Sequence, residues 1–333
     1  VDTQRNEKGK ITDCEYDSMN RIKIITDPMG KTMSYGYDEA GNKTSETNAK
    51  NQTITYTYDK LNRLETVKNP ENSIIRTNTY DANGNLETVA DAKGYVTTYI
   101  YNLANMLETV NDPEIGPSPS KTKYTVKYEY NQFGQKVKQT DAMGHATQYQ
   151  YDNAGNLMKV IDPLHTVTQY EYDKTGNRIS MTNGNDKKTV YTYGSHGLLI
   201  AATDADGKTA SYTYDLVGNV AKMLDKNGNE TLYTYDLGNR LLTKCVTQTG
   251  ESISYAYDET GNRVSMTDIT GTTEYSYNDN NRLLNITKEG SNQVSYTYDD
   301  IGNIETVTDK SGAKVTYSYD TSNRMKDVKH TIG

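Results

Sequence analysis

The sequence predicts an all-β protein of tandem antiparallel β-hairpins that form one coiled, spiralling sheet, as a shell or solenoid fragment. The first observation is a repeat, in which a tyrosine before a polar turn recurs at steps of about 21 residues. The second is the composition, because 30 tyrosines accompany a single phenylalanine and no tryptophan. A repeat of this length is typical of units that bury their surface only against their neighbours. We therefore expect a fold without an ordinary globular core.

The anchor of each repeat is the tyrosine that precedes the first of two turns. One step is longer than the others, between Tyr101 and Tyr130, and contains a segment at 112–124 rich in proline, glycine and serine. Such a segment is expected to lengthen a surface turn without changing the phase of the repeat. We expect one array over residues 1–333 with about fifteen repeats. The anchors are Tyr16, Tyr37, Tyr58, Tyr80, Tyr101, Tyr130, Tyr151, Tyr172, Tyr193, Tyr214, Tyr235, Tyr257, Tyr277, Tyr298 and Tyr319.

Two turns and two strands make up each repeat. The first turn reads Asp-x-x-Gly-Asn, as in YDNAGN at 151–156, and the second follows about ten residues later, as in TDADG at 203–207. Aspartate first and glycine fourth favour a type I turn closed by a left-handed residue. The segments between turns are rich in Thr, Tyr, Val and Ile, which favour strands. The structural residues singled out are Tyr58, Asp59, Tyr151, Asp152, Gly155, Tyr172, Asp173, Gly176, Tyr214, Asp215, Gly218, Tyr298, Asp299 and Gly302.

Alternation along a strand predicts which side chains share a face. In TITYTYD at 53–59, the tyrosines alternate with threonines and are expected to point to one side of the sheet. Leu64 and Thr66, or Leu86 and Thr88, are the candidates to lie between successive tyrosines on that side, in a ladder of rings, aliphatic groups and hydroxyls. Long sheets twist, so the strip is expected to spiral with each turn covering the one before. Whether it forms a wide hollow spiral or a tight rod stays open.

The composition excludes several classes of function. A formal net charge of −8 and a pI of about 5.2 argue against a nucleic-acid partner. No apolar run is long enough to predict a membrane span. Cys14 and Cys245 lie far apart and predict neither a disulfide framework nor a ligand pair. The first residues, VDTQRNEKGK, contain no signal-peptide core and no initiator Met, and the array stops at DVKHTIG, so both ends are expected to be cut from a longer chain.

The repeated Tyr-Asp-x-x-Gly-Asn followed by Arg or Leu resembles the YD repeat of the rearrangement-hotspot (Rhs) family. Similar repeats occur in wall-associated proteins, in C components of insecticidal ABC toxin complexes and in teneurins. The resemblance extends from about Glu15 to Arg324. Gly194 replaces the aspartate in YGSHG and removes a side-chain acceptor, so that turn is expected to be looser. Asparagine, which keeps the chemistry of the turn, replaces the aspartate at Asn102, Asn131 and Asn278.

The resemblance implies a secreted or cell-surface bacterial protein that is not an enzyme. Its function would be structural: the wall of a β-shell that encloses, shields or presents another polypeptide, such as a toxin. The alternative is an extended surface fibre or adhesin. The implied partners are flanking parts of its own longer chain, a toxin cargo or identical subunits. DPMG at 27–30 and DAMG at 141–144 look like the self-cleaving core of the family but sit at ordinary turns, so no catalytic residue is carried over.

No cofactor or metal site is expected. His145 and His165 occupy neighbouring turns without a third ligand at obvious spacing, and His196 and His330 stand apart. Acidic turns at 81–85, 204–207 and 225–230 lack the distal glutamate of a calcium loop, and Asp and Asn suit a turn without any ion. A glycosidase carboxylate pair cannot be chosen, because every repeat offers the same aspartate.

The tyrosine stripes have a second interpretation, as aromatic platforms for sugars or for an unfolded cargo chain. Their recurrence in every repeat favours the structural ladder. A dedicated contact site should instead make one repeat unusual. The unusual places are the segment at 112–124 and the irregular YGSHGLL at 193–199, which are the two candidates for a contact site.

Overall fold

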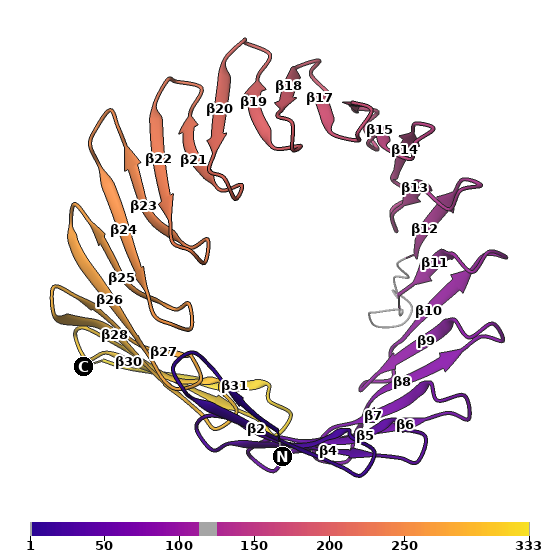
Figure 1. Ribbon diagram of the computed structural model, residues 1–333. Helices are drawn as coiled ribbons and strands as arrows, with labels where there is room; N and C mark the ends of the chain where they lie inside the picture. The colour runs from indigo at the N-terminus through magenta and orange to yellow at the C-terminus, as the bar shows by residue number, and fades with distance from the viewer. Residues whose placement is uncertain (1, 113–124, 333) are drawn as a thin grey trace. The chain divides into compact units, whose positions relative to one another are not determined.

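The computed structural model describes residues 2–112 and 125–332, and all regular structure in these ranges is β-strand. There are 31 strands among these residues, in one sheet, and the pairings that join them are antiparallel. Strands that pair are consecutive in the sequence, as Figure 1 shows for the successive hairpins. The predicted fold class, all-β with tandem antiparallel hairpins, is confirmed. The insertion at 113–124 lies outside the described residues.

Each anchor tyrosine ends an even-numbered strand. These strands are β2 (Ile11–Tyr16), β4 (Thr32–Tyr37), β6 (Thr53–Tyr58), β8 (Ile74–Tyr80), β10 (Val96–Tyr101), β12 (Thr125–Tyr130), β14 (Ala146–Tyr151), β16 (Val167–Tyr172), β18 (Lys188–Tyr193), β20 (Thr209–Tyr214), β22 (Glu230–Tyr235), β24 (Ser252–Tyr257), β26 (Gly271–Tyr277), β28 (Ser291–Tyr298) and β30 (Lys314–Tyr319).

The odd-numbered strands follow the first turn of each repeat, except β1, which begins the described chain. They are β1 (Asp2–Arg5), β3 (Ile22–Thr26), β5 (Lys43–Thr47), β7 (Leu64–Lys68), β9 (Leu86–Asp91), β11 (Leu107–Asn111), β13 (Lys136–Thr140), β15 (Leu157–Ile161), β17 (Arg178–Thr182), β19 (Leu199–Thr203), β21 (Val220–Leu224), β23 (Leu241–Val246), β25 (Arg263–Asp268), β27 (Leu283–Lys288), β29 (Ile304–Asp309) and β31 (Met325–Thr331).

The first turns have the geometry that their residues predict. In the turn after β14, Asp152 N donates to the carbonyl of Asn156 at 2.9 Å, and Gly155 N donates to that of Asp152 at 3.1 Å. The Asp152 carboxylate accepts the backbone N–H groups of Ala154 and Asn156 at 2.9 and 2.8 Å. Gly155 has φ of 91°, a left-handed conformation that glycine adopts without strain. Asparagine takes this position in several other repeats, for example at Asn62 with φ of 60°.

A β-bulge accompanies these turns, as after Tyr58 and Tyr151, and corrects one expectation. Tyr58 pairs with Leu64, but Thr57 pairs with Thr66, so one extra residue lies in β7. The extra residue reverses the alternation, which places Thr66 on the threonine side, 2.7 Å from Thr57 between hydroxyl oxygens. The expectation that Thr66 lies among the tyrosines is therefore wrong. Val67, which pairs with Tyr56, takes that place.

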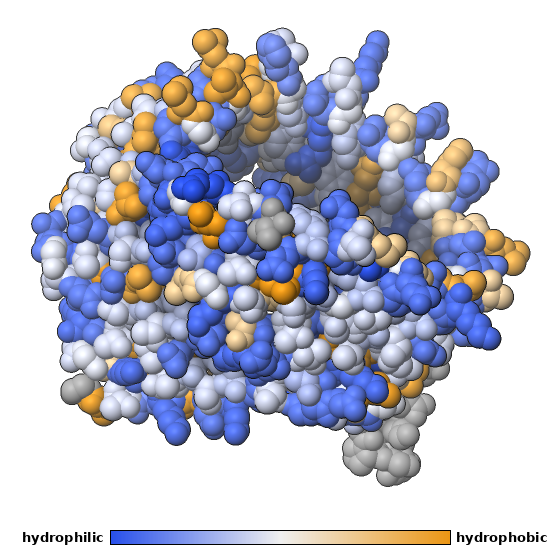
Figure 2. Space-filling view, turned by 60° about the horizontal axis from the view of Figure 1, so that its bottom comes forward, coloured by the Kyte–Doolittle hydropathy of each residue, from blue (hydrophilic) through white to orange (hydrophobic). Residues whose placement is uncertain are grey.

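The sheet has two chemically different faces. One carries the tyrosine rings with aliphatic residues between them, and the other carries threonine pairs such as Thr79 and Thr88, whose hydroxyl oxygens are 2.7 Å apart. Within residues 2–112 and 125–332, the buried apolar residues are only Cys14 and Ala210. The visible surface is largely hydrophilic with scattered hydrophobic side chains (Figure 2). Half-buried rings on a hydrogen-bonded sheet therefore replace a conventional core.

The chain divides into two compact units. Unit 1 consists of Val1–Thr77 and Glu251–Gly333, and unit 2 of Asn78–Gly250. The boundary falls inside β8, and both units contain the same kind of hairpin. Unit 1 thus joins the N-terminal and C-terminal repeats of the chain.

Candidate functional site

In most repeats a hydrogen bond from the anchor tyrosine links a hairpin to the one before it. The Tyr172 hydroxyl donates to the carbonyl of Leu157, the first residue of β15, at 2.9 Å. We call this bond the tyrosine clamp. The same bond, at 2.6–3.0 Å, is made by Tyr37, Tyr58, Tyr130, Tyr151, Tyr193, Tyr214, Tyr235, Tyr277, Tyr298 and Tyr319.

The strand register explains why a carbonyl is available to the clamp. The pairing of β15 with β16 runs from Ile161 opposite Val167 to Lys159 opposite Gln169. Leu157 lies beyond this ladder, so its carbonyl needs a donor other than the backbone of β16. The hydroxyl of Tyr172 supplies that donor. Burial raises the pKa of this phenol above its ordinary value.

The aspartate that follows the anchor holds the turn as a charged acceptor. One carboxylate oxygen of Asp173 accepts the backbone N–H groups of Thr175 and Asn177, both at 2.9 Å, and the Thr175 hydroxyl at 2.7 Å. The other accepts the Asn177 side-chain amide at 2.9 Å. The hydrogen bonds of the Thr175 hydroxyl and the Asn177 amide lower the pKa of Asp173 to about 2. Side-chain hydrogen bonds from the asparagine four residues on also lower the pKa of Asp152 and Asp215.

These pKa values predict that the fold is lost in acid. An aspartate whose pKa is lower in the folded chain stabilises it fully above the unfolded value of about 3.9. That contribution disappears as the pH falls through the folded value, which for Asp173 is about 2. We expect a urea midpoint that is constant from pH 7 to about 5 and falls steeply between about pH 4 and 2. Tyrosine circular dichroism during urea titration at each pH measures it.

The chain contains its own control for this acid dependence. In the turn after β12, Asn131 accepts the same two backbone N–H groups, those of Phe133 and Gln135, at 2.9 and 3.1 Å, without a charge. Asp173→Asn should therefore keep the turn and weaken the loss of stability between pH 4 and 2. A midpoint that stays constant down to pH 2.5 would contradict the charged-acceptor account.

The structure places the sequence-predicted residues in separate copies of one module. Tyr58, Tyr151, Tyr172, Tyr214 and Tyr298 all form the clamp. The aspartate that follows each of them accepts turn N–H groups through one oxygen. Gly155, Gly176, Gly218 and Gly302 have φ between 86° and 95°. These residues do not converge on a single site, since each set serves its own repeat.

Cations between the tyrosine rings are a feature that sequence reasoning missed. The Lys43 ammonium lies 5.6 Å from the centre of the Tyr35 ring and 5.0 Å from that of Tyr56. Arg178 lies in the same way between Tyr170 and Tyr191, at 5.6 and 5.0 Å. Such contacts favour a positive charge over the ring face. The signal in the sequence is a cation directly after the first turn, as in Gly-Asn-Lys and Gly-Asn-Arg.

His145, His196 and the acidic turns make local contacts. His145 Nδ1 lies 3.2 Å from the Asp141 carboxylate, four residues away in the same turn. Asp81 accepts two turn N–H groups and the Asn85 amide, and Asp225 does the same with Asn229. Over residues 2–112 and 125–332, no group of three or more His, Cys, Asp or Glu side chains could hold a metal ion.

Of the two expected contact sites, one can be compared with the other repeats. The turn at 194–198 keeps both backbone hydrogen bonds, from Gly194 to Leu198 at 2.8 Å and from Gly197 to Gly194 at 3.0 Å. Tyr193 makes its clamp at 3.0 Å. Residues 193–199 thus resemble the other repeats, although Gly194 provides no carboxylate. The other candidate, the segment at 112–124, lies outside the described residues from 113 onward.

A contact between turns distant in the sequence, which we call the seam, joins the two segments of unit 1. It sets second turns of the N-terminal segment against first turns of the C-terminal segment. The residues that meet are 249 to 269 positions apart in the sequence. Its ion pairs are Lys8–Asp258, Lys10–Asp279, Lys31–Asp300 and Lys50–Asp299, with N···O distances of 2.6, 2.9, 2.6 and 2.6 Å. Sequence reasoning missed the seam because no local pattern marks which turns meet.

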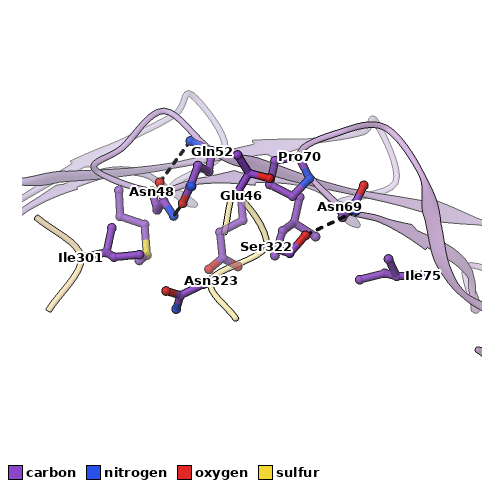
Figure 3. A pocket seen from close by; sticks show the side chains of 12 residues that line it. Glu46, Asn48, Gln52, Asn69, Pro70, Ile75, Ile301, Ser322 and Asn323 are labelled. Atoms are coloured by element: carbon purple, nitrogen blue, oxygen red, sulfur yellow. Dashed lines mark hydrogen bonds between the residues drawn. The ribbon is translucent and has the colours of Figure 1, made fainter. Parts of the chain in front are cut away.

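A cavity of about 270 Å³ lies beside the seam. Amide side chains from the second turns, Asn48, Gln52 and Asn69, line one side, and Ser322 and Asn323 approach from a first turn (Figure 3). The Asn69 amide donates to the Ser322 hydroxyl at 3.3 Å. An apolar part of the lining comes from Met33, Ile54, Ile75 and Ile301. The cavity therefore belongs to the contact between the two segments, with amides at its rim.

Two of the seam aspartates, Asp258 and Asp299, have a pKa below the ordinary value of the group. Burial alone would raise the pKa of Asp258, but the Lys8 ammonium and the Asn262 and Thr260 side chains outweigh it and lower that pKa. At Asp299, Lys50 and Asn303 likewise outweigh burial and lower the pKa. Both carboxylates are largely covered, with 14% and 11% of the side chain exposed. An opposite charge is therefore needed at each position.

Comparison with known families identifies the repeat. A model of the teneurin YD-shell matches residues 115–271 and 248–330. A model of the RHS repeat matches residues 16–53, 37–74 and 80–114. None of the curated proteins compared with the chain matches it. No helix in the described ranges is long and apolar enough to cross a membrane.

Solved structures with the same fold are toxin components. The chain is 17% identical to TcdB2–TccC3 with a TM-score of 0.65, over 98% of this chain and 23% of that one. It is 18% identical, also with a TM-score of 0.65, to the form without the hypervariable C-terminal region, over 96% and 22%. The Photorhabdus luminescens Tc holotoxin pore has the same identity and TM-score, over 95% and 21%. The chain thus spans about a fifth of these relatives and belongs to the teneurin YD-shell family, with RHS repeats in its N-terminal part.

Proposed function

We propose that this chain is part of the wall of a secreted bacterial shell that encloses and shields another polypeptide, such as a toxin. The observation that carries the proposal is the fold shared with TcdB2–TccC3 over almost the whole chain. One of those relatives is part of a holotoxin pore, and another is described by the absence of a hypervariable C-terminal region. Enclosure of a variable segment by a constant wall is consistent with both.

The chemistry of the chain supports a wall better than a catalyst. Consecutive strands pair through their backbones, and the tyrosine clamp supplies a donor for carbonyls beyond the ladder. A wall of this kind separates its contents from water and proteases without performing a reaction. The aspartates that could act in catalysis instead stabilise the turns, where one carboxylate oxygen accepts backbone N–H groups. We propose that residues 1–333 act as one array within a longer protein.

Electron cryo-microscopy of the full-length natural protein tests this proposal. We expect hollow particles with density inside them, together with an internal segment that resists protease while the particle is intact. The matched sample is the same protein after acid treatment, in which the protected segment should become cleavable. Continuous filaments, or particles without internal density and without a protected segment, would overturn the enclosing function and favour a surface fibre.

A further inference from the structure

The repeats raise a question of register at the seam. The four second turns of the N-terminal segment share one backbone geometry, and so do the four first turns of the C-terminal segment. The N-terminal segment could therefore meet the C-terminal segment one repeat earlier or later with a similar fit of the backbone. Side chains must decide among these registers, as they do for strands that slip.

We propose that a charge code on the turns selects the register of the seam. Two positions of each second turn carry the code on the N-terminal segment. The third position reads Lys8, Met29, Lys50 and Glu71 in the four successive turns, and the fifth reads Lys10, Lys31, Gln52 and Ser73. This inference concerns how unit 1 assembles and holds whether or not the shell has a cargo.

The C-terminal segment carries the complementary code on its first turns. Third-position residues face the first residue of a turn, which reads Asp258, Asn278, Asp299 and Asp320 in order. Thus Lys8 pairs with Asp258 and Lys50 with Asp299, while the uncharged Met29 corresponds to the uncharged Asn278. In the fourth turn of the series, Glu71 corresponds to Asp320. Glu71 accepts a hydrogen bond from the Ser322 hydroxyl at 3.2 Å, and Arg324 neutralises Asp320 at 2.7 Å.

Fifth-position residues face the second residue of the following first turn. Lys10 pairs with Asp279 at 2.9 Å and Lys31 with Asp300 at 2.6 Å. The next second turn has Gln52, and the uncharged Thr321 occupies the corresponding place; both line the cavity beside the seam. Opposite charges thus meet in the four ion pairs and uncharged residues meet in two places, while Glu71 faces an aspartate that Arg324 neutralises.

A slip of one repeat in either direction breaks this match. Shifted toward the C-terminus, Lys8 would face Asn278, Lys31 would face Thr321, and Asp299 would face Met29. Lys10 would face Asp300, which no other cation would bind. Lys50 would face Asp320 and would compete for it with Arg324.

The opposite slip introduces repulsion. Lys50 would face Asn278, and Glu71 would lie against Asp299, a largely covered carboxylate. Lys10 and Lys31 would face Glu259 and Asp279, and Lys8 would face Asp236, which Arg240 already binds, so the loss in this direction comes from Lys50 and Glu71. Like charges brought together at a partly covered contact are strongly unfavourable. The native register is therefore the one that keeps all four ion pairs and sets Glu71 against Asp320, which Arg324 neutralises, instead of against Asp299.

Carbodiimide cross-linking of the intact protein reports the register directly, because it joins a lysine to a carboxylate only where the two side chains are in contact. Asp279 and Asp300 are suitable partners, since each occupies the second position of its turn. We expect isopeptide bonds Lys10–Asp279 and Lys31–Asp300, identified by mass spectrometry of tryptic peptides. Predominance of the slipped products Lys10–Asp300 or Lys31–Asp279, or no product across the seam, would overturn the proposal.

A charge exchange tests whether the code causes the register. Lys31→Glu places two carboxylates together, so the yield of the neighbouring product Lys10–Asp279 should fall roughly fivefold. Adding Asp300→Lys restores the opposite charges and should restore the yield. An unchanged yield in Lys31→Glu, or no recovery in the exchanged variant, would show that charge does not set the register.

Two controls separate the code from general stability. Lys138→Glu breaks the Lys138–Glu129 pair of unit 2, which has an N···O distance of 2.8 Å and similar exposure, and should leave the Lys10–Asp279 yield unchanged. Lys31→Gln serves as the second control in case Lys31→Glu folds poorly. It removes the charge without adding repulsion, so it should lower the yield of the Lys10–Asp279 product less than Lys31→Glu does. Equal losses in Lys138→Glu and Lys31→Glu would assign the effect to stability and refute the code.

Discussion

Tyr172→Ala is expected to lower the free energy of unfolding by about 2–3 kcal/mol, the larger part of it from the lost ring. Tyr172 ends β16, where its half-buried ring belongs to the tyrosine face and its hydroxyl donates to the Leu157 carbonyl at 2.9 Å. Alanine removes both the packed ring and the donor. Urea unfolding followed by tyrosine circular dichroism measures the change, and the midpoint is the robust quantity because long repeat arrays do not always unfold in one step.

Tyr172→Phe is the matched variant that separates the two contributions. It keeps the ring and removes only the hydroxyl, so the expected loss is about 1 kcal/mol, the net value of one hydrogen bond. A loss equal to that of alanine would assign the whole effect to the clamp. A loss of zero would show that the Leu157 carbonyl finds water instead. If neither variant lowers the midpoint, the tyrosine face does not stabilise the sheet.

Gly155→Val is expected to cost about 2 kcal/mol, because a β-branched side chain is strained in the left-handed region. Gly155 closes the first turn after β14 with φ of 91°. Its N–H donates to the Asp152 carbonyl at 3.1 Å, so relief of the strain would break the turn. The nearest atom to an added Cβ is the flexible Gln135 amide at 3.3 Å, which can move. The cost therefore comes from the backbone and not from a clash, and the urea midpoint reports it.

Gly155→Asn is the control that the chain itself suggests. Asn62 and Asn239 occupy the equivalent position with φ of 60°. Each also accepts a hydrogen bond from the asparagine of the preceding first turn, Asn42 or Asn219, at 2.9 Å. At residue 155 the Gln135 amide could donate in the same way, so we expect a loss below about 1 kcal/mol. Valine and asparagine with equal effects would contradict the backbone explanation.

The hairpins could be read from the sequence because their causes are local. An aspartate accepts the N–H groups two and four residues ahead, and glycine or asparagine adopts a positive φ, so the turn at 152–156 needs no distant contact. Tyrosine and β-branched residues then favour strands on either side. A period of about 21 residues carries these preferences along the chain.

The faces were predicted less well, although the signal was present. A type I turn closed by a left-handed residue carries a bulge, and that bulge shifts the alternation by one residue. Applying it to the turn after Tyr58 would have placed Val67, and not Thr66, among the tyrosines. The clamp partner was also beyond local reasoning, because the hydroxyl of Tyr172 binds a carbonyl fifteen residues earlier on another hairpin.

The sequence by itself determined the unit of this protein: the turn residues, the strands between them and the tyrosine that ends each repeat. Only the tertiary structure decided which units meet, as Lys31 meets Asp300 and Lys50 meets Asp299 across the seam. The physical reason is that turn chemistry acts over about five residues and is nearly the same in every repeat. The choice among equivalent turns depends on pairs of charges that come together only when the sheet has folded.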